Sequence, residues 1–128
     1  MLKKQFLTIC LSIIPTILCS DVIEISKDNF SKQIVKSKTP VILDVYATWC
    51  GPCRKMKPIF EEVSNEFTGK IVFAKMDFDK EPTLSQKLGV NVLPTFIIYH
   101  NGQVIQKVVG SQTKENLIKT LNELLNNI

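Results

Sequence analysis

The spacing of hydrophobic and polar residues changes several times along the chain, and from residue 21 onward it separates strand-like from helix-like stretches. The stretch 41–47 (VILDVYA) is an almost continuous run of β-branched and apolar residues, which is typical of a strand buried on both faces of a sheet. Asn101-Gly102 is a strong signal for a tight hairpin between two strands. We predict strands at 22–25, 41–47, 71–77, 95–100 and 103–109.

Helical periodicity lies between these strands. Asp28 is predicted to cap a helix that runs to about Lys36. A long helix should follow residues 49–53 and end near Gly69, and a short one should cover residues 82–88. The apolar face of the long helix is predicted to comprise Met56, Ile59, Phe60, Val63 and Phe67. The last helix, at about 113–126, has a predicted buried stripe of Leu117, Ile118, Leu121, Leu124, Leu125 and Ile128.

The order of these elements predicts the fold class. Strands that alternate with helices pair in parallel through right-handed crossover connections, whereas the hairpin near the carboxyl end must be antiparallel. The sequence therefore predicts an α/β domain with a mixed central sheet and helices on both faces. At 128 residues, with 45% apolar and 22% charged residues, the chain has the length and composition of one ordinary globular domain.

Residues 1–20 differ from the rest. Lys3 and Lys4 are followed by an apolar run from Phe6 to Leu18, and the first acidic residue is Asp21. This layout is typical of a secretory signal peptide, and the run is short for a membrane span. We expect residues 1–20 to be a cleaved signal peptide and 21–128 to be the domain.

The cleavage signal itself is weak, because neither a cut after Ser20 nor one after Cys19 places a small residue at the third position back. An uncleaved membrane anchor and lipidation of Cys19 remain alternatives. Export would remove Cys10 and Cys19 together with two lysines, so fourteen basic residues would face twelve acidic ones, where the whole chain has sixteen and a net charge of +4. That small excess gives no indication of nucleic-acid or anionic-lipid binding.

Cys50 and Cys53 lie three residues apart in WCGPC (49–53), where the buried strand gives way to a helix. Side chains at this spacing are neighbours, at about 5–6 Å between Cβ atoms, so a disulfide can open and close with little backbone movement. Cys50 falls at the helix start, where free N–H groups favour a thiolate, so we expect Cys50 to attack and Cys53 to resolve. Pro52 suits the first helical turn, and Gly51 permits close approach of a partner.

Asp44 interrupts the apolar run six residues before Cys50. Burial raises the pKa of a carboxyl group, so a buried Asp44 is a candidate acceptor for the proton of Cys53. Lys75 in the next strand is a candidate charge partner. The alternative is an aspartate at a strand end that faces water. A zinc site is not predicted, because it needs about four nitrogen or sulfur ligands, and Cys50, Cys53 and the distant His100 are too few.

The sequence resembles the thioredoxin family over essentially all of residues 21–128. The motifs that carry the resemblance are WCGPC (49–53) after VILDVYA, Pro58, AKMD (74–77), LGVNVLPT (88–95), NG (101–102) and VVG (108–110). The resemblance implies the thioredoxin fold, a central mixed five-stranded sheet flanked by four helices. It also implies that Cys50 is the nucleophile, Cys53 the resolving cysteine, and Asp44 and Lys75 the buried acid and its lysine.

Further residues are assigned by the resemblance alone. Pro94 matches a cis-proline opposite the disulfide, and Leu93 would offer its backbone to an extended client segment. The implied docking surface comprises Trp49, Gly51, Pro52, Val92, Leu93, Pro94 and Gly110. The alternatives are that Pro94 is an ordinary trans turn proline and that Trp49 is simply a core residue. No cofactor and no metal are implied.

The leading hypothesis is a protein-disulfide reductase that acts outside the cytoplasm, because Gly-Pro between the cysteines is found in reducing members of the family. Its partners would be disulfide-containing client proteins and a membrane or other thiol donor, and we expect a monomer. An exported oxidase or isomerase and a reductant dedicated to one client, such as apocytochrome c, are alternatives from the same class. A non-catalytic binding or metal-chaperone domain is an alternative from a different class.

The compartment follows from the first twenty residues. The chain ends in LLNNI and carries no ER-retention tetrapeptide, so a bacterial periplasm is the expected location. Disulfides persist in such an oxidising compartment, and a reductant there needs a supply of electrons.

Overall fold

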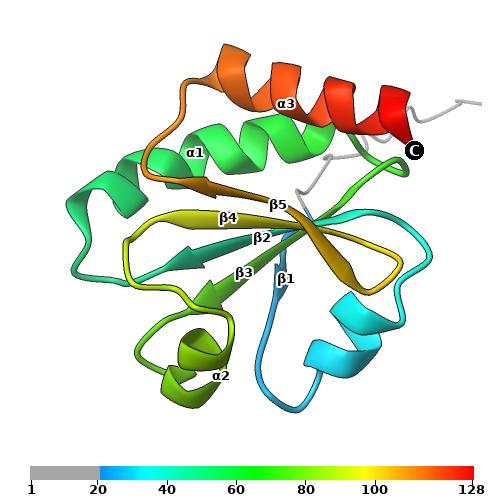
Figure 1. The fold of residues 1–128 in the computed structure, drawn as a ribbon. Helices are drawn as coiled ribbons and strands as arrows, with labels where there is room; N and C mark the ends of the chain where they lie inside the picture. Colours follow the sequence, from blue (N-terminus) through cyan, green and yellow to red (C-terminus); the bar gives the residue numbers. More distant parts are fainter. Residues whose placement is uncertain (1–20) are drawn as a thin grey trace, which may run out of the picture.

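The computed structural model describes residues 21–128 of the chain (Figure 1). The predicted signal peptide at 1–20 lies outside the described residues. Five strands form one sheet in the order β1-β3-β2-β4-β5. The strands are β1 (Ile23–Glu24), β2 (Val41–Tyr46), β3 (Val72–Asp77), β4 (Thr95–His100) and β5 (Gln103–Val109). β1 and β2 both pair with β3 in parallel, and β4 is antiparallel to β2 and to β5.

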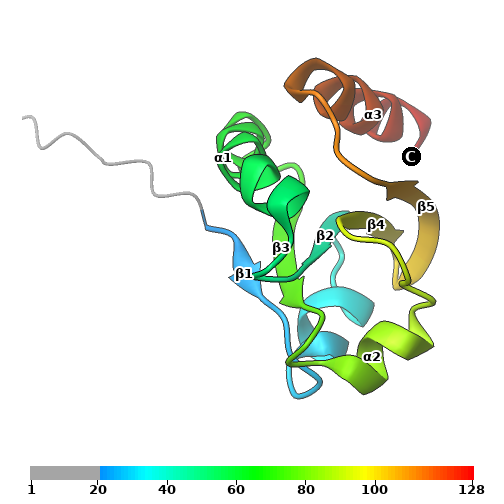
Figure 2. The ribbon, with the colours of Figure 1, turned by 90° about the vertical axis from the view of Figure 1, so that its left-hand side faces the viewer.

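Helical elements cover both faces of this sheet. They are the π-helix η1 (Ser31–Val35) and the α-helices α1 (Gly51–Glu66), α2 (Pro82–Lys87) and α3 (Lys114–Asn127). α1 and α3 lie side by side over one face, and η1 and α2 lie against the other (Figure 2). The predicted α/β class, the mixed five-stranded sheet and the four helical elements are therefore confirmed.

The core has two layers because successive residues of β2 and β4 point to opposite faces. Ile42 and Phe96 pack with α1 and α3 in one layer, around Phe60 and Leu121. Leu43 and Ile97 belong to the other layer, with Ile34 of η1. Asp44 shares the face of Ile42 and so lies beneath α1.

The hairpin between β4 and β5 forms where Asn101-Gly102 predicted it. Asn101 and Gly102 have positive φ angles of 52° and 76°, as a two-residue turn with matching twist requires. A Cβ atom at Gly102 would lie 2.6 Å from the carbonyl oxygen of Val35. Glycine therefore serves both the turn and the contact between the hairpin and the end of η1.

Two predictions about the helices are wrong. Asp28 does not cap the first helix: its own N–H donates to Ser26 Oγ, and the N-cap residue of η1 is Phe30, which makes no side-chain cap hydrogen bond. Asn29 organises this turn, since its side chain accepts from the Ser26 N–H and donates to the Glu24 carbonyl. Ile128 lies beyond the end of α3 and is 52% exposed, so it does not extend the buried stripe.

Within residues 21–128 we find no helix with the length and apolar character that crossing a membrane would need.

The buried stripe of α3 should carry much of the stability of its layer. Leu121→Ala removes a fully buried side chain, so it should lower the free energy of unfolding by about 2–5 kcal/mol in urea denaturation. Ile128→Ala is the matched control, with an expected change below about 0.5 kcal/mol. Equal losses in the two variants would contradict this placement of the stripe.

Candidate active site

Cys50 and Cys53 form a disulfide at the junction between β2 and α1. Their Cα atoms are 5.2 Å apart, within the ordinary range for a disulfide. Cys50 is the N-cap residue of α1, with extended backbone, and its Sγ accepts a hydrogen bond from the Cys53 N–H at 3.2 Å. Pro52 occupies the first helical turn, where its missing N–H leaves no helical hydrogen bond unmade.

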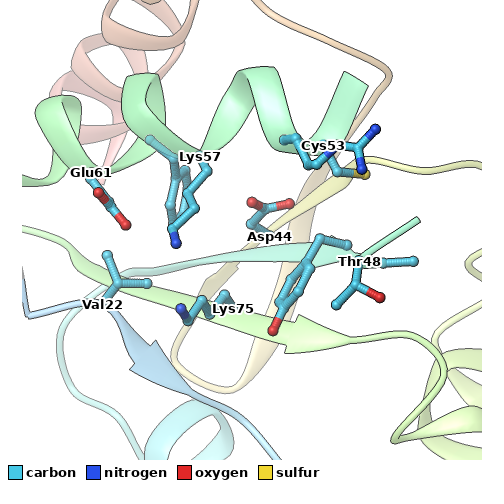
Figure 3. Close-up of a pocket in the computed structure, with 11 residues that line it drawn as sticks. Val22, Asp44, Thr48, Cys53, Lys57, Glu61 and Lys75 are labelled. Carbon is cyan, nitrogen blue, oxygen red and sulfur yellow. The ribbon is translucent and has the colours of Figure 1, made fainter. Parts of the chain in front are cut away.

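The two cysteines border different hollows of the surface. Cys50 lines a groove of about 340 Å³ that also contains Trp49, Gly51, Pro52 and Leu93. Cys53 lines a cavity of about 350 Å³ between α1 and the sheet (Figure 3). Cys50 therefore borders the outer groove, and Cys53 borders the cavity beneath α1.

Asp44 lies in the inner cavity, with its carboxylate directed toward α1 (Figure 3). Its side chain is 5% exposed, and Oδ1 has no hydrogen-bond partner among the described residues. Burial raises the pKa of Asp44 from 3.8 to about 7, and the positive charge of Lys75 opposes that rise. The alternative of a water-facing aspartate is wrong, because the Asp44 side chain is buried and β2 is the middle strand of the sheet, flanked by β3 and β4.

Lys75 is the register partner of Asp44 between β2 and β3, so both side chains stand on the same face of the sheet. Its ion pair, however, is with Glu24 of β1, at 3.7 Å between Nζ and Oε2. Glu24 also accepts a hydrogen bond from the Tyr46 hydroxyl at 3.1 Å. Neither Glu24 nor Tyr46 was identified from the sequence, because nothing in one strand indicates which residue of a neighbouring strand lies beside it.

The peptide bond between Leu93 and Pro94 is cis, so the trans alternative is wrong. Leu93 packs against Ala47 and the two cysteines. Two hydrogen bonds hold the loop: Thr95 Oγ1 donates to the Val92 carbonyl, and the Gly110 N–H donates to the Pro94 carbonyl at 2.8 Å. The loop that the family resemblance placed opposite the disulfide is therefore in contact with it.

Trp49 is 65% exposed, so the alternative of a core tryptophan is wrong. Its Nε1 donates to Asp79 Oδ2 at 2.7 Å, and the Asp79 N–H in turn donates to the carboxylate of Asp77. Val92 is also exposed, whereas Gly51, Leu93 and Gly110 are half-buried. Phe78 and Asn91 line the Cys50 groove as well, without any prior signal in the sequence.

Metal ligation finds no support in the described part of the chain, where no group of three or more His, Cys, Asp or Glu side chains is placed to hold an ion. His100 ends β4 at the opposite end of the sheet from the cysteines, since β4 is antiparallel to β2 and the residues flanking the pair follow the end of β2.

Comparison with known proteins gives one consistent result. The thioredoxin family model matches residues 21–123. The chain is similar to thioredoxin of Haemophilus influenzae, with 36% identity over 81% of this chain and 97% of that protein. It is similar to thioredoxin of Synechocystis, with 34% identity over 80% of this chain and 95% of that protein. The bifunctional thioredoxin reductase/thioredoxin of Mycobacterium leprae is 33% identical over 83% of this chain, which spans 23% of that protein.

Asp44 should make stability depend on pH. Because its pKa rises from 3.8 to about 7 on folding, the folded protein binds more protons than the unfolded chain between those values, and stability falls as pH rises through them. Asp44→Asn removes this penalty, so its stability relative to the natural protein should rise by up to about 4 kcal/mol from pH 4 to pH 8. Urea denaturation of the oxidised proteins at several pH values measures the difference.

Burial of the new amide has a cost of its own, but that cost is the same at every pH, so the slope with pH is the result that counts. Asp28→Asn, at an exposed position, is the control for loss of a carboxylate. A stability difference for Asp44→Asn that does not change with pH would contradict the burial of a titrating carboxyl.

Proposed function

Because the chain belongs to the thioredoxin family of thiol–disulfide oxidoreductases, we propose that it reduces disulfides of client proteins outside the cytoplasm. The pair at the β2–α1 junction is the observation that carries the proposal. Cys50 opens to the outer groove and Cys53 to the cavity that holds Asp44. This division gives the two thiols different tasks in one reaction cycle.

The first half-reaction joins the client to Cys50. In the reduced protein the Cys50 thiolate attacks one sulfur of the client disulfide. A bond forms between Cys50 Sγ and that sulfur, and the client S–S bond breaks. The other client sulfur leaves with the electron pair and takes a proton from water. The Cys53 N–H, which donates to Cys50 Sγ, is placed to stabilise the attacking thiolate.

The second half-reaction releases the client. Cys53 transfers its proton to Asp44 and attacks Cys50 Sγ, which breaks the mixed disulfide and expels the second client sulfur. That sulfur takes up the proton held by Asp44, so the client has gained two electrons from the protein, one proton from water and one proton from Cys53 by way of Asp44. A pKa of about 7 lets Asp44 hold or release a proton near neutral pH, as an acid–base group in this step requires.

The direction of electron flow is argued from the residues between the cysteines. Pro52 has no N–H, and the hydrogen bond that reaches Cys50 Sγ comes from Cys53. A strong oxidant needs a cysteine thiolate that is stabilised well beyond what this hydrogen bond provides, because the reduced form of an oxidant must be favoured. The M. leprae relative, whose name joins a thioredoxin to a thioredoxin reductase, also favours a reductive role for such a domain.

The docking role is assigned to the outer groove. Trp49 offers exposed apolar surface beside Cys50, Val92 is exposed in the loop before the cis-proline, and the backbone of Leu93 can pair with an extended client segment. Restoring the dithiol requires a donor of the same class, a reduced dithiol protein, which in an oxidising compartment must draw its electrons across the membrane.

Export is argued from the sequence of residues 1–20. Two lysines, an apolar run without acidic residues and a polar end have the order of a signal peptide. Periplasmic delivery would place the Cys50–Cys53 pair among proteins that form disulfides, which supplies the clients.

The reductive role predicts a low reduction potential. Equilibration with dithiothreitol, followed through the fluorescence of Trp49, should give a value nearer to about −270 mV, the reference for thioredoxin, than to about −120 mV, the value of a strong oxidant. Catalysed reduction of insulin should be lost in Cys50→Ser, and Cys53→Ser should retain clients as mixed disulfides. A reduction potential near the oxidising end would contradict the reductase role and would favour an oxidase instead.

Export predicts processing of the full chain in a Gram-negative host. Cell fractionation and intact mass should find the protein in the periplasm, shortened at Ser20 or Cys19. Ile13→Arg, which interrupts the apolar run, should leave it uncut in the cytoplasm. Full-length protein in the membrane would indicate an anchor instead, and a lipid mass on Cys19 would indicate lipidation.

A further inference from the structure

Glu24 binds two of the side chains that border the inner cavity. Its Oε1 accepts from the Tyr46 hydroxyl at 3.1 Å, and its Oε2 lies 3.7 Å from Lys75 Nζ. Tyr46 and Lys75 both line the cavity that contains Asp44 and Cys53. Glu24 itself is absent from that lining, so it contacts the active-site region from outside.

The sheet register explains why these groups meet. Glu24 of β1 pairs with Lys75 of β3, and Lys75 pairs with Asp44 of β2, all in parallel strands. Register partners stand on the same face, and neighbouring strands are about 4.8 Å apart. Lys75 therefore stands between two carboxyl groups in a row across three strands. In Figure 3 its ammonium group points away from the Asp44 carboxylate.

We propose that Glu24 is a positioning residue for the second half-reaction, which holds the Lys75 ammonium group at the sheet edge and so determines how readily Asp44 accepts the proton of Cys53. The two carboxyl groups compete for one cation. Glu24 is about half exposed and keeps its charge at little cost, whereas Asp44 is buried. The Tyr46 hydroxyl donates to the Glu24 carboxylate and so helps to fix its position.

Other groups face Asp44 as well, and Glu24 acts in their presence. The register partner on β4 is the neutral Phe96. The titratable or charged groups lining the cavity are Tyr46 from β2, Lys75 from β3 and Cys53, Arg54, Lys57 and Glu61 from α1. Among the charged ones, Lys75 is the group whose charge counters the effect of burial on the pKa of Asp44.

Glu24→Gln tests the inference. The new amide oxygen still accepts from Tyr46, but the charge that holds Lys75 is gone, so the ammonium group is free to turn toward Asp44. The pKa of Asp44, followed by NMR of its carboxyl carbon in the oxidised protein, should fall by about half a unit. The pH midpoint of mixed-disulfide resolution, measured by stopped flow, should move down with it.

The same substitution in a Lys75→Met variant distinguishes positioning of the Lys75 ammonium group from direct repulsion between the two carboxylates. In Lys75→Met, the substitution Glu24→Gln should move the Asp44 titration by less than half as much, because the group through which it acts is missing. Glu62→Gln is the charge-matched control: Glu62 pairs with Lys114 on α3, away from the cavity, and should leave the titration unchanged. Tyr46→Phe should lower the pKa of Asp44 less than Glu24→Gln does.

The outcomes are distinct. An unchanged Asp44 titration in Glu24→Gln, or an equal shift with and without Lys75, overturns the inference, and a loss of stability alone would make Glu24 a structural residue. The inference rests on the proton-acceptor role proposed for Asp44. The carboxyl titration needs neither client nor donor, so it stands or falls independently of the reductase and of export.

Discussion

Burial of one carboxyl group on the middle strand is the constraint to which the rest of the active site is fitted. β2 has neighbours on both sides and α1 above it, so Asp44 is desolvated, and Oδ1 finds no hydrogen-bond donor among the described residues. Such a group destabilises the folded state once it ionises, because the charge is not compensated. The fold tolerates it where two core layers supply the opposing stability. The result is a titratable carboxyl group within the same cavity as Cys53.

The junction of β2 and α1 places the two cysteines close to this buried carboxyl group. A helix that starts soon after a central strand places its first N–H groups near the carboxyl end of that strand, where they favour a thiolate at Cys50. Cys53 follows one helical turn later, so it borders the cavity between α1 and the sheet, whereas Cys50 borders the outer groove. The loop around the cis-proline borders the outer groove, where Leu93 packs against the cluster of Ala47, Cys50 and Cys53. Attack and resolution are thereby assigned to opposite sides of one disulfide.

The sequence predicted what depends on periodicity and on local motifs. Each predicted strand overlaps an observed one, and those at 95–100 and 103–109 coincide with β4 and β5, because β-branched runs and Asn101-Gly102 act over a few residues. The buried stripe of α3 was extended one residue too far, to Ile128, since no pattern shows where a terminal residue loses its neighbours. Asp28 was misassigned because the side chains of Ser26 and Asn29, rather than that of Asp28, make the hydrogen bonds to the backbone of this turn.

Contacts between strands far apart in the sequence were the part that could not be predicted. Asp44 and Lys75 were paired by resemblance, but the ion pair of Lys75 is with Glu24, and the row of three residues depends on the order β1-β3-β2. The two-residue strand β1 adds little to the core, yet it brings a carboxylate to the lysine whose charge opposes the rise in the pKa of the buried acid. A short edge strand is thus coupled to the active site through charge rather than packing. Substitutions there can change proton transfer while the fold, the disulfide and the client groove stay as they are.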